Sequence, residues 1–195
     1  MINDALQFIT SELNTFINNN VRQENGIQPP LVVTDHISRY TNTSQGHSSD
    51  QSQGAIVISL VNLEEDHFSK TGTIGLTQAN RENTGSPFNN TNLYCLVAVV
   101  TGPYNRGLEY LSLIVQFFYD RPVFDPTNSH MDETMGLDKI SVDRVNLNME
   151  QNQQLWQMLG TNYRPSVLYR LKLKTDHITS GNIHKTGRTI SIHQP

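Results

Sequence analysis

The run Glu64, Glu65, Asp66 and His67 contains the residue types that come nearest to a reactive site. It directly follows an apolar segment that we predict to be a strand. Carboxylates and an imidazole at the end of a strand can bind a divalent cation, or can act as general acid and general base. A solvent-exposed passage from strand to loop has the same composition, and we favour this second interpretation.

Other residues that could perform catalysis lie in unfavourable contexts. Cys95 lies in the most apolar segment, where we expect a buried, inert thiol, because a nucleophilic cysteine needs an electropositive and partly exposed setting. The seven histidines lack the spacing of a metal-binding helix. Residues 72–75 lack the Gly-Lys-Ser/Thr ending of a phosphate loop. We therefore predict no catalytic, cofactor or metal site, and a protein that is not an enzyme.

Charge is distributed unevenly along the chain. Residues 161–195 carry six basic side chains and one acidic one, whereas the remainder carries 8 basic and 17 acidic side chains. Such asymmetry is typical of nucleic-acid contact or of matched faces between subunits. Nucleic acid would require stacking aromatics near the cations, and we expect Tyr169 to point to the apolar side of its strand. Subunit contact is favoured over nucleic acid, and a plain solvated face is an equal alternative.

Length and composition fit one soluble domain. The chain has 195 residues, and only 16% of them are charged. Its polarity comes from 20 Asn and 13 Gln. The N-terminus has no basic and apolar leader, and no apolar run approaches the ~20 residues of a membrane span. We expect synthesis in the cytoplasm and no membrane contact.

Hydrophobic periodicity predicts an α+β fold with a mixed β-sheet of about five strands. An N-terminal helix, a central helix and a short third helix flank the sheet, with a long loop and an extended C-terminal tail. Asn148 and Gln151 form a capping box for the third helix, Gly160 ends it, and Asn105 caps the central one. We predict helices at 3–19, 105–119 and 149–159, and strands at 31–38, 55–63, 92–101, 140–147 and 167–175.

Two parts of the chain are predicted to project from this domain, which spans residues 1–177. The stretch 64–92 is polar and irregular, and such long loops are usually functional. Residues 178–195 form the tail, in which Thr189–Ile192 can donate a strand. The loop 41–54 contains no apolar residue.

Three stretches in sequence resemble a known family. They are Ile58–Asp66, then residues 92–98 with Gly107–Ser112 and Phe117–Phe124, then Leu155–Arg170. Together they are similar to the cap, or tail-terminator, family of phage-tail-like contractile injection systems of the anti-feeding-prophage and virulence-cassette type. The resemblance covers residues 1 to 177.

This resemblance implies a structural protein without catalysis. Such a cap forms a ring, by resemblance a hexamer, that ends inner-tube polymerisation and anchors the last sheath layer at the end distal to the baseplate. The implied partners are further copies of the chain, the inner-tube protein and the sheath protein, in a particle released extracellularly. The chain lacks the long C-terminal extension of some relatives, and its 41–54 loop is similar to a local insertion.

The candidate interface combines the acidic run, the basic strand and the tail. We expect the 64–92 stretch to face the tube or a neighbouring copy, and the tail to add a strand to a sheath subunit. The candidate interface residues are Glu64, Glu65, Asp66, Arg170, Lys172, Lys174, Lys185, Arg188, Ile190 and Ile192.

Two alternatives remain open at this stage. One is a neck or connector protein of a contractile-tailed phage, which would bind a head-completion protein. The other is a small metal-dependent hydrolase that uses Glu64, Glu65, Asp66 and His67.

Overall fold

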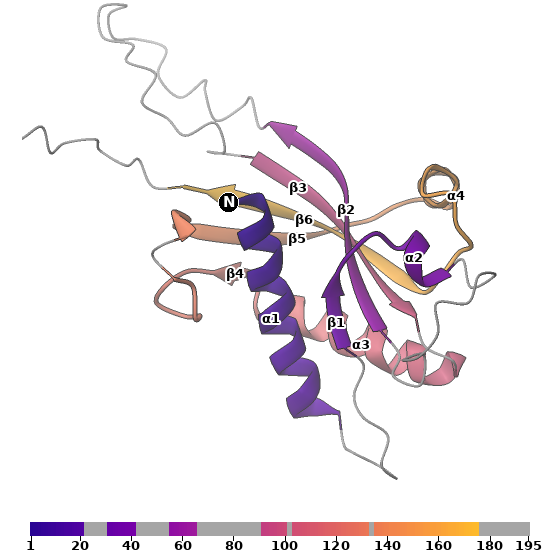
Figure 1. Cartoon of the computed structure of the whole chain (residues 1–195), viewed down its shortest axis with the longest axis horizontal. Helices are drawn as coiled ribbons and strands as arrows, with labels where there is room; N and C mark the ends of the chain where they lie inside the picture. The colour runs from indigo at the N-terminus through magenta and orange to yellow at the C-terminus, as the bar shows by residue number, and fades with distance from the viewer. Residues whose placement is uncertain (22–30, 42–54, 66–90, 101–102, 133–134, 176–195) are drawn as a thin grey trace, which may run out of the picture.

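A computed structural model describes residues 1–21, 31–41, 55–65, 91–100, 103–132 and 135–175 of the chain. These residues form one mixed sheet with helices on both faces (Figure 1). The strands are β1 (Leu31–Thr34), β2 (Ala55–Glu65), β3 (Thr91–Val100), β4 (Val123–Phe124), β5 (Lys139–Val145) and β6 (Ser166–Lys174). The helices are α1 (Ile2–Asn20), α2 (Ser38–Thr41), α3 (Tyr104–Asp120) and α4 (Met149–Met158).

The sheet has six strands in the order β1-β2-β3-β6-β5-β4. β1 runs parallel to β2, and every other neighbouring pair is antiparallel. The most apolar strand, β3, lies between β2 and β6, as its composition predicts, because a strand inside a covered sheet needs apolar residues on both faces.

Helices α1 and α3 cover one face of the sheet. The α1 residues Ile9, Leu13 and Ile17 recur every four positions, are fully buried and belong to the larger core. Phe117 of α3 lies at the centre of this core, where its ring contacts those of three other phenylalanines. The neighbouring rings are those of Phe16, Phe118 and Phe124, with centroids at 5.1, 4.9 and 5.9 Å.

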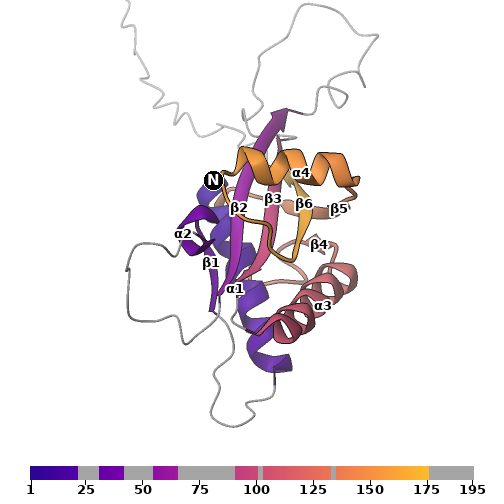
Figure 2. The same ribbon diagram turned by 90° about the vertical axis from the view of Figure 1, so that its right-hand side faces the viewer.

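The second core is smaller and lies on the opposite face, under α2 and α4 (Figure 2). Leu96 and Ala98 of β3 contribute to it, together with Leu168 of β6. Trp156 is the only buried residue within α4. Leu155 of the helix and Leu159 directly after it pack into the same core, so three side chains hold α4 against the sheet.

The α+β class is confirmed, with differences in detail. The sheet has a sixth strand, β4, which is too short for periodicity to reveal. Glu64 and Glu65 are part of β2, where they pair with Asn92 and Thr91, so the irregular stretch begins later than predicted. The cap predicted at Asn105 is wrong, because α3 begins at Tyr104 after Pro103 and has no side-chain cap.

The signals for α4 are confirmed. The Asn148 side chain accepts from the Gln151 amide at 2.8 Å, and the Gln151 side chain accepts from the Asn148 amide at 3.0 Å. Gly160 follows the helix with a φ of 65°, a conformation that favours glycine.

Several sequence-based expectations fall outside the described residues. The loop predicted at 41–54, the projection and the tail are almost wholly among them. The division at residue 177 therefore stays a prediction. Within the described ranges, no helix is long and apolar enough to cross a membrane.

Truncation of Phe117 tests the larger core. We expect Phe117→Ala to lower the free energy of unfolding by about 3–5 kcal/mol, because it opens a cavity among packed rings. Tyr119→Ala on the same helix is the matched control, since that side chain is 83% exposed and its removal should cost less than about 0.5 kcal/mol. Urea denaturation followed by circular dichroism measures both. Equal losses in the two variants would contradict this packing.

Candidate interaction surface

A β-bulge in β2 decides which side chains share a face at one end of the sheet. Leu60 pairs with Cys95, whose side chain lies in the larger core, and the next pair along the strands is Asn62 with Tyr94. Val61 is thus an extra residue in β2. An extra residue reverses the alternation of side chains. Each β2 side chain after the bulge therefore points to the face opposite to the one that simple alternation predicts.

The bulge places Glu64 among polar side chains from three neighbouring strands. This group occupies the end of the sheet that extends past α4, on the face that α4 covers farther along (Figure 2). We call it the polar sheet face, and its members are Asn62, Glu64, Asn92, Tyr94, Asp143, Arg170, Lys172 and Lys174.

Hydrogen bonds link acidic and basic members of the polar sheet face. Tyr94 Oη donates to Glu64 Oε2 at 2.8 Å, and Asn62 Nδ2 donates to Glu64 Oε1 at 3.2 Å. Arg170, directly opposite Tyr94 in the sheet, donates from Nη2 to Asp143 Oδ2 at 2.8 Å. The bond to Glu64 raises the pKa of Tyr94, and the bond to Asp143 raises the pKa of Arg170.

These contacts orient the side chains more than they stabilise the fold. Arg170 and Asp143 are 40% and 58% exposed, and an exposed ion pair contributes less than about 1 kcal/mol. The pair nevertheless holds the guanidinium in a fixed position. The side chains of the polar sheet face are thus held in position before any partner binds. Substitutions that remove these side-chain contacts should leave the fold intact.

Two polar atoms of this face are buried and lack a partner. Among the described residues, neither Asn92 Oδ1 nor Arg170 Nε has a hydrogen-bond partner. A buried polar atom left in this state costs about 1–3 kcal/mol. Because both atoms are buried, a contacting molecule can reach them only if the two side chains move.

The structure brings only part of the predicted interface together. Glu64, Arg170, Lys172 and Lys174 share the polar sheet face, whereas Glu65, one residue further along β2, points to the opposite side of the strand. The other predicted residues lie outside the described ranges, and their placement stays a prediction. They are Asp66, Lys185, Arg188, Ile190 and Ile192.

Sequence reasoning missed Tyr94 and Asp143. Tyr94 interrupts the apolar run of β3, which is the one signal that marks its outward face. Asp143 carries no comparable signal, because its role depends on the antiparallel pairing that sets it opposite Arg170. Asp143 reduces the separation of charge inferred from composition, since it pairs with Arg170 of the basic region within one chain.

The hydrolase alternative is described only in part, because Asp66 and His67 lie outside the described residues. Of its other two residues, Glu64 accepts from Tyr94 and Glu65 points to the opposite side of β2. Within the described ranges no three His, Cys, Asp or Glu side chains cluster in a way that could hold a metal ion. Cys95 is buried, as predicted, and burial raises the pKa of its thiol to about 12. A thiol in this state is a poor nucleophile.

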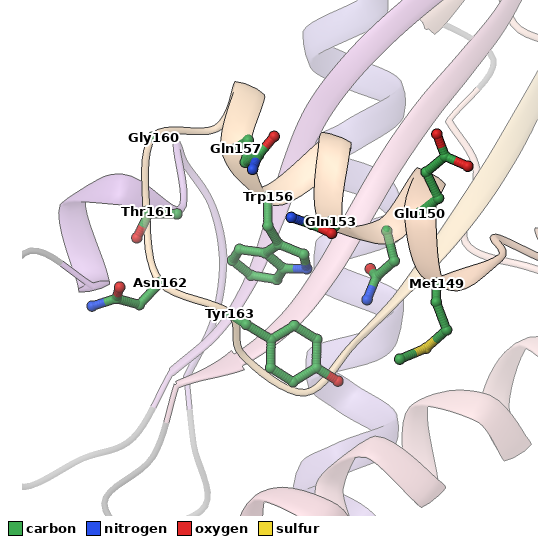
Figure 3. Close-up of a pocket in the computed structure, with 10 residues that line it drawn as sticks. Met149, Glu150, Gln153, Trp156, Gln157, Gly160, Thr161, Asn162 and Tyr163 are labelled. Carbon is green, nitrogen blue, oxygen red and sulfur yellow. The ribbon is translucent and has the colours of Figure 1, made fainter.

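A groove lies beside α4, next to the smaller core. It has a volume of about 770 Å³ and is lined by α4 and by residues 160–163 (Figure 3). Trp156 packs edge-on against Tyr163, with ring centroids 5.6 Å apart. We call this the α4 groove. Amide side chains form much of its wall, and Glu150 is its only charged lining residue.

The arrangement of the described elements matches solved structures of injection particles. All of this chain aligns with 64% of the sheath/tube terminator of an extracellular contractile injection system, PVC, in its extended state, with a TM-score of 0.55 and 14% identity. At this identity the likeness establishes a shared fold. The anti-feeding prophage tube-terminating cap aligns with a TM-score of 0.47 and 15% identity, over 97% of this chain and 60% of the other.

The chain belongs to the Pvc16 N-terminal domain family, which it matches over residues 6–189. This membership confirms the resemblance to the cap family that the sequence motifs indicated. The chain spans less than two thirds of the length of the two solved proteins that it resembles. Comparison with curated protein sequences gives no match.

Alkylation tests the environment of Cys95. At about pH 8 the folded chain should resist iodoacetamide, because a pKa about three units above the ordinary value makes thiolate roughly a thousandfold scarcer. Unfolding in urea should make the cysteine react at the rate of a free thiol. Mass spectrometry after timed quenching measures both rates. Rapid labelling of the folded chain would show that Cys95 is exposed.

The raised pKa of Cys95 also predicts that the free energy of unfolding depends on pH. Above about pH 9 the unfolded chain loses the thiol proton, while the folded chain retains it up to about pH 12, so stability should fall across this range. Cys95→Ala should lower this slope, as measured by urea denaturation between pH 8 and about pH 10. An unchanged slope would mean that other groups account for it.

Proposed function

We propose that this chain is a structural cap, a tail terminator, of a contractile injection system. It forms a ring, most simply a hexamer, that ends inner-tube polymerisation and anchors the last sheath layer at the end distal to the baseplate. The observation that carries this proposal is the family match over residues 6–189, on a chain whose whole length follows the fold of a sheath/tube terminator. The role is structural rather than enzymatic.

The polar sheet face supports an assembly role. It offers fixed charges of both signs, with two buried polar atoms that lack partners among the described residues. Contact with the tube, the sheath or a neighbouring copy would satisfy them once the two side chains move. The abundance of Asn and Gln fits the same role, since amides can hydrogen-bond across an interface without the desolvation cost of a buried charge.

The proposal extends to partners and location. The inner-tube protein, the sheath protein and further copies of the chain are the partners, and no cofactor, nucleic acid or membrane takes part. The chain becomes part of a particle that is released extracellularly. No feature of the described residues favours the phage neck protein over this role.

Tube length is the direct test of the cap. Tube and sheath proteins expressed with this chain should give particles of uniform length with a ring at one end, whereas omission of the chain should give tubes of scattered length. Negative-stain electron microscopy measures the length distribution and the end density. An unchanged distribution, with the chain absent from purified particles, would contradict the cap role.

Charge reversal tests the polar sheet face. We expect the double variant Lys172→Glu and Lys174→Glu to fold normally but to bind assembled tubes or neighbouring copies at least about tenfold more weakly, because like charges would meet across the contact. Arg39→Glu on α2 is the control, an exposed arginine outside this face. Co-sedimentation measures binding to tubes, and light scattering measures association between copies of the chain. Wild-type binding by the double variant would exclude this face as a contact.

A further inference from the structure

The α4 groove continues into a neighbouring hollow. A second hollow of about 290 Å³ lies next to it, between the β5–α4 connection and β6. The two share Met149, Asn152 and Tyr163 as lining residues. They therefore form one continuous surface depression, rather than two separate pockets of the size that holds a small molecule.

The floor of the groove carries an unused hydrogen-bond donor. Trp156 is 4% exposed, and its Nε1 has no hydrogen-bond partner among the described residues. Figure 3 shows this nitrogen directed toward the Met149 end of the groove. An indole can only donate, so the missing partner is an acceptor such as a peptide carbonyl. A donor left unsatisfied in a buried position is costly, which favours an occupied groove.

The walls indicate what kind of peptide fits. Met149 and Tyr163 are 88% and 60% exposed and offer apolar contact, while amide side chains between them can pair with a peptide backbone. Glu150 is the only charged lining residue of the α4 groove. The matching ligand is an extended peptide with apolar side chains at alternate positions and one basic residue.

The chain itself contains such a peptide, at Arg188–Ile192. In an extended conformation Arg188, Ile190 and Ile192 point to the same side. Arg188 has the charge to pair with Glu150, while Arg144 lines the adjoining hollow. This segment lies outside the described residues. Of the other long undescribed segments, 42–54 contains no apolar residue. The segment 66–90 has an alternating apolar pair, Ile74 and Leu76, but the nearest positions on the same side are Gly72 and Gln78 rather than a basic residue.

The direction of β6 favours a groove on another copy. β6 begins at Ser166, beside the groove, and ends at Lys174, about 30 Å away at the opposite end of the sheet (Figure 1). The chain therefore leaves the sheet directed away from its own groove. Residues 176–187 can span at most about 40 Å, which would also allow a return to the chain's own groove, so the direction of β6 rather than reach favours the neighbour.

We propose that Arg188–Ile192 of one copy docks as an extended strand in the α4 groove of a neighbouring copy. Ile190 and Ile192 lie over Trp156, a carbonyl of the segment accepts from its Nε1, and Arg188 lies beside Glu150. The inference rests on the proposed ring, which supplies the neighbour. It gives the C-terminal region a role in joining subunits.

Cysteine cross-linking between two populations of the full chain tests this docking. One population carries Asn152→Cys in the groove, and the other carries Gln194→Cys, which lies on the same side of the extended segment as the isoleucines. Mild oxidation of the mixture should give a cross-linked dimer. The matched control replaces the groove cysteine with Asn105→Cys, an exposed residue of α3, and should give none. Buried Cys95 stays in place in every variant.

Each outcome decides the inference separately from the cap role. Rings that form without the dimer overturn the docking and leave the cap intact. A cross-link obtained only when both cysteines share one chain shows that the segment docks in its own groove, which also overturns it. A protein that stays monomeric and gives no cross-link overturns the docking as well. The tube-length assay then tests the cap role independently.

The only tryptophan of the chain provides a second measurement. Ile190→Asp should weaken docking roughly tenfold or more, because it removes a buried aliphatic side chain. It should also change the Trp156 emission, because the hydrogen bond from Nε1 to the docked segment is lost. Ile183→Asp, in the same region but outside the docking segment, is the control and should leave the emission unchanged. Identical emission from the wild type and both variants, at protein concentrations that give rings, would contradict the docking.

Discussion

β3 is apolar on both faces along one half and on only one face along the other, and the rest of the structure follows from this constraint. Along Leu96–Val99 every side chain is buried, so helices must cover both faces of the sheet there. Toward its beginning, Asn92 and Tyr94 replace apolar residues on the α4 side. The second layer of helices therefore stops short, and one end of the sheet keeps a polar face.

The bulge at Val61 decides which glutamate belongs to that face. Without it, Glu64 would point toward the α1 and α3 side and Glu65 toward the polar sheet face. With it, Glu64 accepts from Tyr94 beside the arginine of the Arg170–Asp143 pair. A single inserted residue thus selects the carboxylate that meets Tyr94, at the cost of one irregular step in the ladder.

The two faces of the sheet have different mechanical roles. The α1 and α3 side is a continuous core with interlocked phenylalanine rings, which makes it the rigid body of the subunit. On the other side, α4 is held by Trp156 together with Leu155 and Leu159, and its outer surface stays available for contact. The proposed ring would use this combination, because a rigid body would fix the geometry of the ring while exposed surfaces would join its members.

Local signals in the sequence were enough for the α+β class, the principal helices and strands, the central position of β3, the capping box of α4 and the buried state of Cys95. Each depends on residues near one another in the chain, as Asn148 and Gln151 do. The bulge, the short strand β4 and the pairing of Tyr94 and Asp143 with distant residues were decided only by the tertiary structure. Strand register joins segments far apart in sequence, and no local pattern records which residues will lie opposite one another.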